Sequence, residues 1–444
     1  MYDYGVRYLF VLKYVPMFSS SLFGGIGRAL THRQYRLLWF SNATNTSGRW
    51  MFKVAIGWLT WEMTQSTSWL GVVAFADTFP MVLMSIVAGA WADRLGYLFI
   101  MLLSQTVMVI AGMIISTLAF LDSLNILSII ILTFIVGTSE AVTTPARISL
   151  VHRLVPKEDL SAAIALNTAT YNLARFLGPT IAGGLIIWVS IPSVIAFAAV
   201  TFAIFYCALF FLKTDEPKRQ AINNSNLMQE LIDGFGYAFS HSGILFILIL
   251  LSVTALLIRP YIDLLPAVSA EMFGRGAEGL SILLAATGFG ATVGGIWLAQ
   301  RGRTEGLTAV FTWSLLISAV SILFFILSGN IWFGAVLIMI VGFFVVSGTI
   351  AGQILIQNAV SPGIRARVIG ITAVLSWGLP AVGALGMGWI AELLGLPVTL
   401  AVGGVVTVLL WGWAHRTGPQ MATDLENMED TPAGPKSAMN RKLS

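Results

Sequence analysis

The sequence is dominated by apolar runs of about 20 residues that recur from Leu37 to about Trp413 with only short polar interruptions. A run of this length is what an α-helix needs to cross the ~30 Å hydrocarbon core of a bilayer. Hydrophobic residues make up 57% of the 444 positions and charged residues only 10%, whereas soluble domains carry about 25% charged residues. We therefore expect an integral membrane protein, and we count twelve spans. Short connections favour helices over a transmembrane barrel.

Basic residues lie beside alternate ends of these runs. They follow the even-numbered spans at Arg94, Arg153, Lys218, Arg301, Arg365 and Arg416, whereas the opposite loops keep only Arg275. By the positive-inside rule both termini are cytoplasmic. The net charge of +4 thus reports orientation in a membrane, and no nucleic-acid partner is expected. The single cysteine, Cys207, permits no internal disulfide.

Polar segments divide the chain into five parts. Residues 1–35 are expected to be a cytoplasmic segment with an interfacial stretch, and residues 36–213 a bundle of six helices. Residues 214–242 form a cytoplasmic linker in which apolar residues recur at the spacing of an amphipathic helix. A second bundle of six helices is expected over 243–415, and a disordered cytoplasmic tail over 416–444.

The second half repeats the first in outline. The residues 298–301 that follow span eight correspond to 92–94 after span two, and the glycines of 378–383 echo those of 178–183. Duplicated six-span halves are typical of secondary transporters, which bind substrate between the halves near the midplane.

Five charged residues lie inside the apolar runs of the first half, where a charge costs several kcal/mol unless it is paired or faces water. They are Arg49, Lys53, Asp77, Glu140 and Arg175. Counted inward from the outer ends, Lys53 and Asp77 lie at equal depth, where they can pair. Arg49, Glu140 and Arg175 all fall near the midplane and would form a cluster.

This pattern supports two interpretations. In the functional one, Glu140 or Asp77 gains and loses a proton as a central cavity alternates between the two sides. In the structural one, the charges form a salt-bridge network that locks the first bundle, and Arg175 serves helix packing. The five charges carry one excess positive charge, which hints at an anionic or zwitterionic substrate.

Polar residues of the second half are weaker candidates. Arg259 and Asp263, four residues apart, are expected to form a local pair near the outer mouth. Gln353 and Gln357 on span ten are candidates for hydrogen bonds to substrate, although bonds between helices explain them equally well.

No motif for enzymatic chemistry stands out. Glycine is never followed by lysine, so there is no ATP-binding G-x-x-x-x-G-K-[ST] loop, and there is no G-x-S-x-G elbow. The four histidines are scattered without the spacing of metal ligands. We expect no enzyme activity, no cofactor and no metal.

A loop signature identifies the family that the chain resembles. Gly89, Asp93, Arg94 and Gly96 match the G-x-x-x-D-R-x-G loop of the major facilitator superfamily, placed between spans two and three. The usual pair of basic residues that follows is replaced by Tyr97 and Leu98, so the charge latch of this loop is incomplete.

Further tracts resemble the transmembrane secretion effector branch of that superfamily, akin to macrolide and siderophore exporters. They comprise residues 145–147, 159–167 and 172–179, the last of which ends in Gly178 and Pro179. With the loop signature, these two residues form the conformational motif that the resemblance implies.

The resemblance implies an all-α membrane protein with twelve transmembrane helices in two pseudo-symmetric six-helix bundles. It further implies a monomeric transporter of a bacterial inner membrane that works by alternating access, with protons as the coupling ion. Its partners would be the lipid bilayer, protons and a small amphipathic substrate, drug-like or siderophore-like, which it would export. Two alternatives remain: an importer of an organic anion with the same fold, and a membrane sensor or assembly factor that transports nothing.

Overall fold

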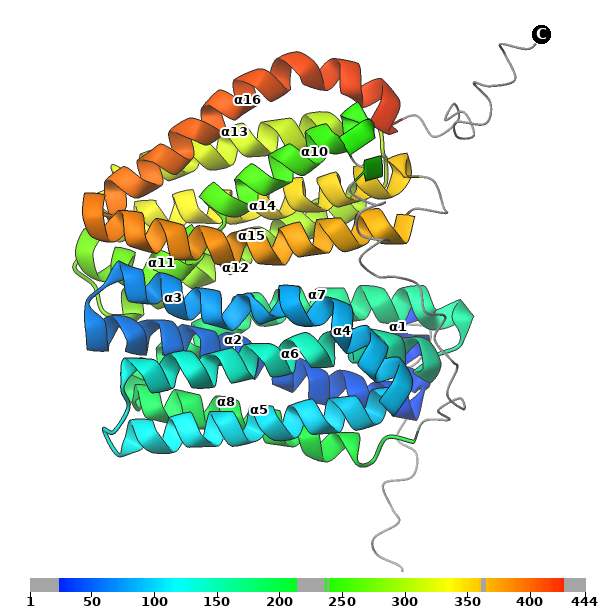
Figure 1. Cartoon of the computed structure of the whole chain (residues 1–444), viewed down its shortest axis with the longest axis vertical. Coiled ribbons are helices and arrows are strands. Elements are labelled where there is room, and N and C mark those ends of the chain that lie inside the picture. The colour runs from blue at the N-terminus through cyan, green and yellow to red at the C-terminus, as the bar shows by residue number, and fades with distance from the viewer. Residues whose placement is uncertain (1–23, 214–235, 238, 361–364, 427–444) are drawn as a thin grey trace, which may run out of the picture.

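A computed structural model describes residues 24–213, 236–237, 239–360 and 365–426. The interfacial stretch expected before residue 24 and most of the expected amphipathic helix of the linker lie outside these residues. The described helices form two bundles, stacked one above the other in Figure 1, one from each half of the sequence.

The first bundle begins with a short helix, α1 (Gly24–Thr31), followed by six long helical segments. The segments are α2 (Arg33–Thr64), α3 (Thr67–Thr78) together with α4 (Pro80–Leu95), α5 (Tyr97–Phe120), α6 (Ile126–Leu154), α7 (Lys157–Trp188) and α8 (Ile191–Leu209). Helices α3 and α4 form one segment that is broken before Pro80, because proline lacks a backbone N–H and clashes with the preceding turn.

The second bundle repeats this plan with six further segments. The first of them is composite and consists of α10 (Ser242–Val253), the π-helical turn η2 (Thr254–Ile258), α11 (Tyr261–Ala267) and a second π-helical turn, η3 (Val268–Met272). The others are α12 (Ala277–Arg301), α13 (Leu307–Ile326), α14 (Ile331–Ala359), α15 (Arg365–Leu394) and α16 (Leu396–Glu426).

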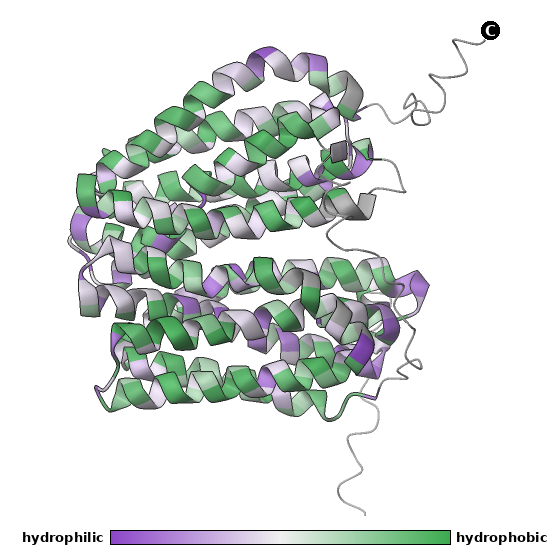
Figure 2. Cartoon of the chain, in the orientation of Figure 1, coloured by the Kyte–Doolittle hydropathy of each residue, from purple (hydrophilic) through white to green (hydrophobic). Residues whose placement is uncertain are grey.

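Ten segments of the described chain are long and apolar enough to cross a membrane. Helices α2 and α7 are not among them, although each is 32 residues long and packs within the first bundle. Both carry polar and charged residues along their length. Length and composition thus support ten spans among the described residues. The count of twelve, which would include α2 and α7, stays a prediction. Figure 2 shows the apolar residues along the helices.

One boundary differs from the expectation. We placed a disordered tail from residue 416, but α16 continues to Glu426. The Glu426 carboxylate accepts hydrogen bonds from the backbone N–H groups of Gly306 (2.6 Å) and Thr308 (2.8 Å). These are donors at the start of α13, which the helix itself leaves unpaired. Capping of α13 therefore accounts for the extra turns of α16.

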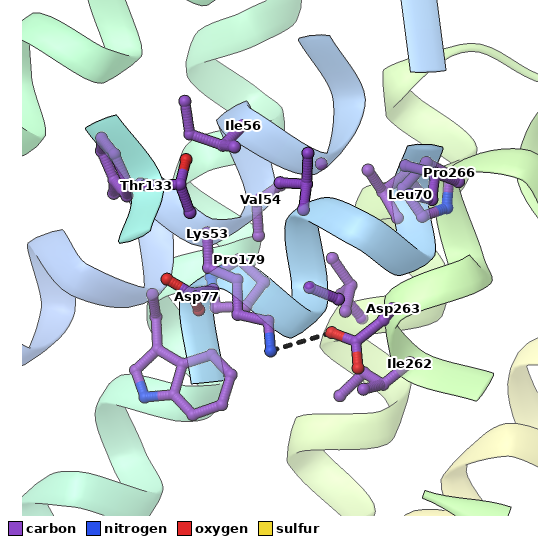
Figure 3. Close-up of a pocket in the computed structure, with 17 residues that line it drawn as sticks. Lys53, Val54, Ile56, Leu70, Asp77, Thr133, Pro179, Ile262, Asp263 and Pro266 are labelled. Atoms are coloured by element: carbon purple, nitrogen blue, oxygen red, sulfur yellow. Dashed lines mark ion pairs between the residues drawn. The ribbon is translucent and has the colours of Figure 1, made fainter. Parts of the chain in front are cut away.

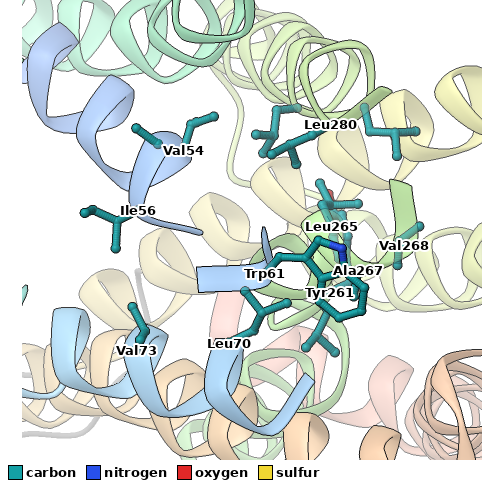
Figure 4. Packing of buried hydrophobic residues seen from close by; sticks show 14 of the residues in the cluster. Val54, Ile56, Trp61, Leu70, Val73, Tyr261, Leu265, Ala267, Val268 and Leu280 are labelled. Atoms are coloured by element: carbon teal, nitrogen blue, oxygen red, sulfur yellow. The ribbon is translucent and has the colours of Figure 1, made fainter. Parts of the chain in front are cut away.

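The two bundles share a hydrophobic core at one end only. We call the end where α4 meets α5 and α6 meets α7 the basic end, after Arg94 and Lys157 in these connections. At the opposite end, a single cluster joins both halves through residues such as Trp61 and Leu265 (Figure 4). Toward the basic end each half has its own cluster, around Phe205 in the first and Phe311 in the second. The halves are thus sealed together away from the basic end.

Small residues bring α3 and α15 into close contact across this seal. A Cβ atom added to Gly71 would lie 2.5 Å from the Ala384 carbonyl oxygen, and one added to Gly388 would lie 2.5 Å from the Thr67 carbonyl oxygen. Thr67 Oγ1 donates to the Gly388 carbonyl at 2.9 Å. At the tip of the seal, Glu392 accepts hydrogen bonds from the Ser66 hydroxyl (2.8 Å), the Thr67 hydroxyl (3.2 Å) and the Ser68 N–H (3.2 Å).

Candidate functional site

Three neighbouring cavities lie between the bundles, and all three are lined by Trp50 and Lys53 of α2. The first, of about 50 Å³, is mainly apolar and is lined by residues such as Val54, Ile56 and Leu70 (Figure 3). The second, of about 140 Å³, is lined by five charged residues of the first bundle, namely Arg49, Lys53, Asp77, Glu140 and Arg147. The third, of about 90 Å³, draws its walls from both bundles. An apolar compartment therefore adjoins two charged ones.

The charges of α2 pair differently from the expectation. Lys53 and Asp77 do not pair with each other. Arg49 Nη2 instead forms an ion pair with Asp77 Oδ1, and Lys53 Nζ forms one with Asp263 Oδ1 at 2.9 Å. Figure 3 shows the Lys53 amine pointing at Asp263, with Asp77 on its other side. Arg49 and Asp77 both belong to the first bundle, so of the ion pairs within the described ranges it is the Lys53–Asp263 pair that joins the two halves.

Local structure explains why Asp263 is free to pair across the interface. We expected Arg259 and Asp263 to form a pair within one helix, and this was wrong. The π-helical turn η2 ends at Ile258, just before Arg259, and Pro260 stands between Arg259 and α11, which starts at Tyr261 and carries Asp263. Arg259 Nη1 donates instead to the Ser376 carbonyl oxygen of α15 at 2.8 Å. Turns of this kind are frequent at functional sites.

Glu140 lies in the second cavity with Arg49, as expected, but its partner is Arg147 of the same helix. Arg147 Nη2 lies 3.3 Å from Glu140 Oε1, and its Nη1 donates to Asn42 Oδ1 at 3.0 Å. Glu140 Oε2 is buried and has no hydrogen-bond partner among the described residues. Only one oxygen of this carboxylate is therefore satisfied.

Arg175 does not join Arg49 and Glu140 in the second cavity but lines the third. Its guanidinium carbon lies 5.7 Å from the centre of the Trp50 ring, a cation–π distance. Its Nε atom is buried and has no hydrogen-bond partner among the described residues. The expected cluster of three charges is thus divided between two adjacent cavities.

Gln353 and Gln357 are not among the residues that line these cavities. Gln357 is exposed and Gln353 half-buried near the basic end of α14. The structure does not bring them to the charged residues, because they lie on a part of α14 that is closer to its end than the cavities are.

The residues of the loop signature lie at the connection between α4 and α5, and their conformational role stays a prediction. Gly96 has φ +98°, a conformation that favours glycine, and it separates α4 from α5 without any longer loop. Arg94 is exposed, and the side chain of Asp93 lies outside the described part. A Cβ at Gly178 would lie 2.6 Å from Trp50 Cβ, so this glycine lets α7 approach α2. Pro179 next to it lines the apolar cavity.

Three residues of the site escaped the sequence interpretation. Arg147 was counted with the basic loop, but it lies inside α6, two helical turns after Glu140 and on the same face. That spacing is a signal that could have found it. Asp263 was assigned to the wrong partner, and Tyr171, which lines both charged cavities, carried no signal.

Curated relatives are all transporters by name. The chain is 24% identical over 367 residues to the staphyloferrin A transporter of Staphylococcus aureus, covering 82% of this chain and 91% of the relative. It is 22% identical to the multidrug efflux pump Tap of Mycolicibacterium fortuitum, covering 84% and 93%. It is 20% identical to macrolide efflux protein A of Streptococcus pyogenes, covering 65% and 72%.

Solved structures show the same fold. The nucleoside transporter NupG superimposes with a TM-score of 0.67 at 16% identity, covering 86% of this chain and 98% of NupG. A bacterial homologue of the human lysosomal transporter Spinster, in an inward-facing and unoccupied conformation, gives 0.65 at 15% identity, covering 90% and 99%. The transmembrane secretion effector family matches residues 28–441. The chain therefore belongs to the transmembrane secretion effector family and is a membrane transporter of the major facilitator type.

Proposed function

We propose that this protein is a secondary active exporter of small amphipathic molecules that works by alternating access and is driven by protons. The observation that carries the proposal is a set of three ion pairs lining cavities at the boundary between two separately packed bundles. Charged side chains inside membrane-spanning helices are costly in free energy unless they face water or a polar substrate. Efflux relatives support the direction, and the apolar cavity beside the charged ones suits an amphipathic substrate.

The arrangement of cores supports alternating access. The halves are joined at the end opposite the basic end and have separate cores toward it. If the basic end is cytoplasmic, as the positive-inside rule implies, the molecule is sealed on the outside in this state. To open outward, α3 and α15 must part, and the Lys53–Asp263 pair must break because it joins the halves.

Glu140 is the carboxyl group best suited to take up a proton. Asp77 Oδ1 accepts a hydrogen bond from Arg49, so this carboxylate is already held by a close ion pair. Glu140 has a longer contact with Arg147, and its buried Oε2 has no hydrogen-bond partner among the described residues, so a proton on Oε2 displaces no existing hydrogen bond. Glu140 and Asp77 are the two candidates from the sequence analysis, and we assign the coupling proton to Glu140.

The test uses everted membrane vesicles that carry a respiration-driven pH gradient. Adding substrates from a panel of amphipathic compounds is expected to dissipate the gradient in vesicles with the wild-type protein. Vesicles with Glu140→Gln are expected to keep it, and those with Glu158→Gln, an exposed residue at the start of α7, to behave as wild type. Transport that survives the collapse of every ion gradient would exclude coupling.

Import of an organic anion is the second candidate, and one observation favours it. The two charged cavities hold five basic residues against three acidic ones, so they carry an excess of positive charge. Uptake of an organic anion by intact cells that is lost with Arg49→Ala would support import. Uptake unaffected by that substitution would contradict a role of Arg49 in it.

A further inference from the structure

Among the described residues, two arginines of the third cavity form no ion pair, because Asp263 of the same cavity pairs with Lys53. The other three cations of the site are neutralised, since Arg49, Lys53 and Arg147 each pair with a carboxylate. Arg175 forms no ion pair within the described residues, and its Nε atom is buried without a hydrogen-bond partner. In the part of the chain that the structure describes, Arg259 donates to a backbone carbonyl, that of Ser376. The excess of two positive charges is thus located in these two side chains.

Their positions make the excess charge unusual. Arg175 comes from α7 of the first bundle, and Arg259 follows the π-helical turn η2 of the second, yet both line one cavity of about 90 Å³. Two like charges that line one cavity of this size repel each other in a low-dielectric interior. Arginine presents planar donors that suit a carboxylate. An anion held between them would remove the repulsion and satisfy the unpaired donor.

The remaining walls favour a particular kind of anion. Trp50 and Trp377 line the cavity together with Tyr171, so flat apolar surfaces surround the two guanidinium groups. The Trp50 ring packs edge-on against Tyr171, with ring centroids 6.1 Å apart. A ligand that has a carboxylate next to a flat, apolar group would meet both kinds of wall.

We propose that Arg175 and Arg259 form a binding site for the carboxylate of an amphipathic anionic substrate, with the aromatic side chains of the same cavity holding its apolar part. This inference rests on the proposed function, because it treats the cavity as part of the substrate path. It narrows the substrate class from amphipathic molecules in general to anionic ones. Because the two arginines belong to different bundles, the bound carboxylate also bridges the halves.

The test measures binding of benzoate and benzamide to the detergent-purified full-length protein by titration calorimetry. The two probes share a ring and differ mainly in charge. The wild-type protein is expected to bind benzoate about tenfold or more tightly than benzamide, because hydrogen bonds to charged groups are the stronger kind. Arg175→Gln and Arg259→Gln should each remove this preference without changing benzamide binding, and Arg175→Lys should keep part of it.

The control is Arg275→Gln, an exposed arginine outside the cavities, which is expected to leave the preference unchanged. Equal binding of the two probes, no benzoate binding at the highest soluble concentration, or a preference that persists in both glutamine variants would overturn the proposal. The measurement needs no ion gradient. Vesicles that move no protons would therefore defeat the proposed coupling while leaving the charge preference of the cavity intact, and the two failures can be distinguished.

Discussion

The contact between α3 and α15 gives the sharpest prediction for the conformational cycle. A Cβ added at Gly71 would lie 2.5 Å from the Ala384 carbonyl oxygen, which is backbone and cannot rotate away. To regain an ordinary contact of 3.4 Å, α15 must shift by about 0.9 Å. Overpacking of this kind costs about 1–3 kcal/mol. Because the cost arises only while the halves are sealed, Gly71→Ala is expected to favour the outward-open state by about 5- to 150-fold.

The assay reads the opening of the seal as thiol accessibility from outside the cell. A cysteine replaces Ile262, which lines the apolar and the third cavity, in a chain whose native Cys207 is changed to serine. Gly71→Ala should raise the rate at which a membrane-impermeant maleimide labels this cysteine by about 5- to 150-fold. The matched control is Gly184→Ala in α7, where an added Cβ meets nothing within 4 Å. A labelling rate that stays constant, or that rises equally in the control, would refute the reasoning.

Three further perturbations test other contacts. Lys53→Met and Asp263→Leu should each lower the free energy of unfolding by about 1–3 kcal/mol, less than for a fully buried pair because 29% of the Lys53 side chain is exposed. The double variant should recover most of the loss in thermal unfolding. A hydrogen bond from His32 lowers the pKa of Asp159 below its usual 3.8. Docking of α1 on α7, read by hydrogen exchange of the α1 backbone amides, should therefore persist at neutral pH and weaken only as the pH falls below about 3.8, while Asp159→Asn should weaken it at every pH. Glu392→Gln removes the charged acceptor at the tip of the seal, and it should speed the same outside labelling.

The charged residues in apolar runs indicate the inward-facing positions from the sequence alone. Arg49, Lys53, Asp77 and Glu140 all line cavities between or beside the bundles. The reason is physical, since a charged side chain on a spanning helix cannot face lipid at low cost and must turn toward the interior. A single sequence therefore predicts which side chains point inward, although it does not predict what they meet there.

The partners of these charges did not follow from depth along each helix. Counting residues from the outer ends paired Lys53 with Asp77, but it ignored rotation about the helix axis and the approach of the second bundle. The π-helical turn η2 and Pro260 aim Asp263 at Lys53. Such a turn depends on packing around it and leaves no pattern that a periodicity argument detects.

The sequence by itself determined that the chain lies in a lipid bilayer, that it is helical, that its two halves share one plan, and which charged residues face inward. The reason is that hydropathy and the free-energy cost of exposing a charge to lipid act on each span separately. The tertiary structure alone decided which charges are neutralised, and hence that Arg175 and Arg259 are the two cavity arginines without an ion pair among the residues described. Pairing depends on how two bundles, distant in sequence, are oriented toward each other. That orientation is set by close contacts such as the one between α3 and α15, which many residues make together and no single segment encodes.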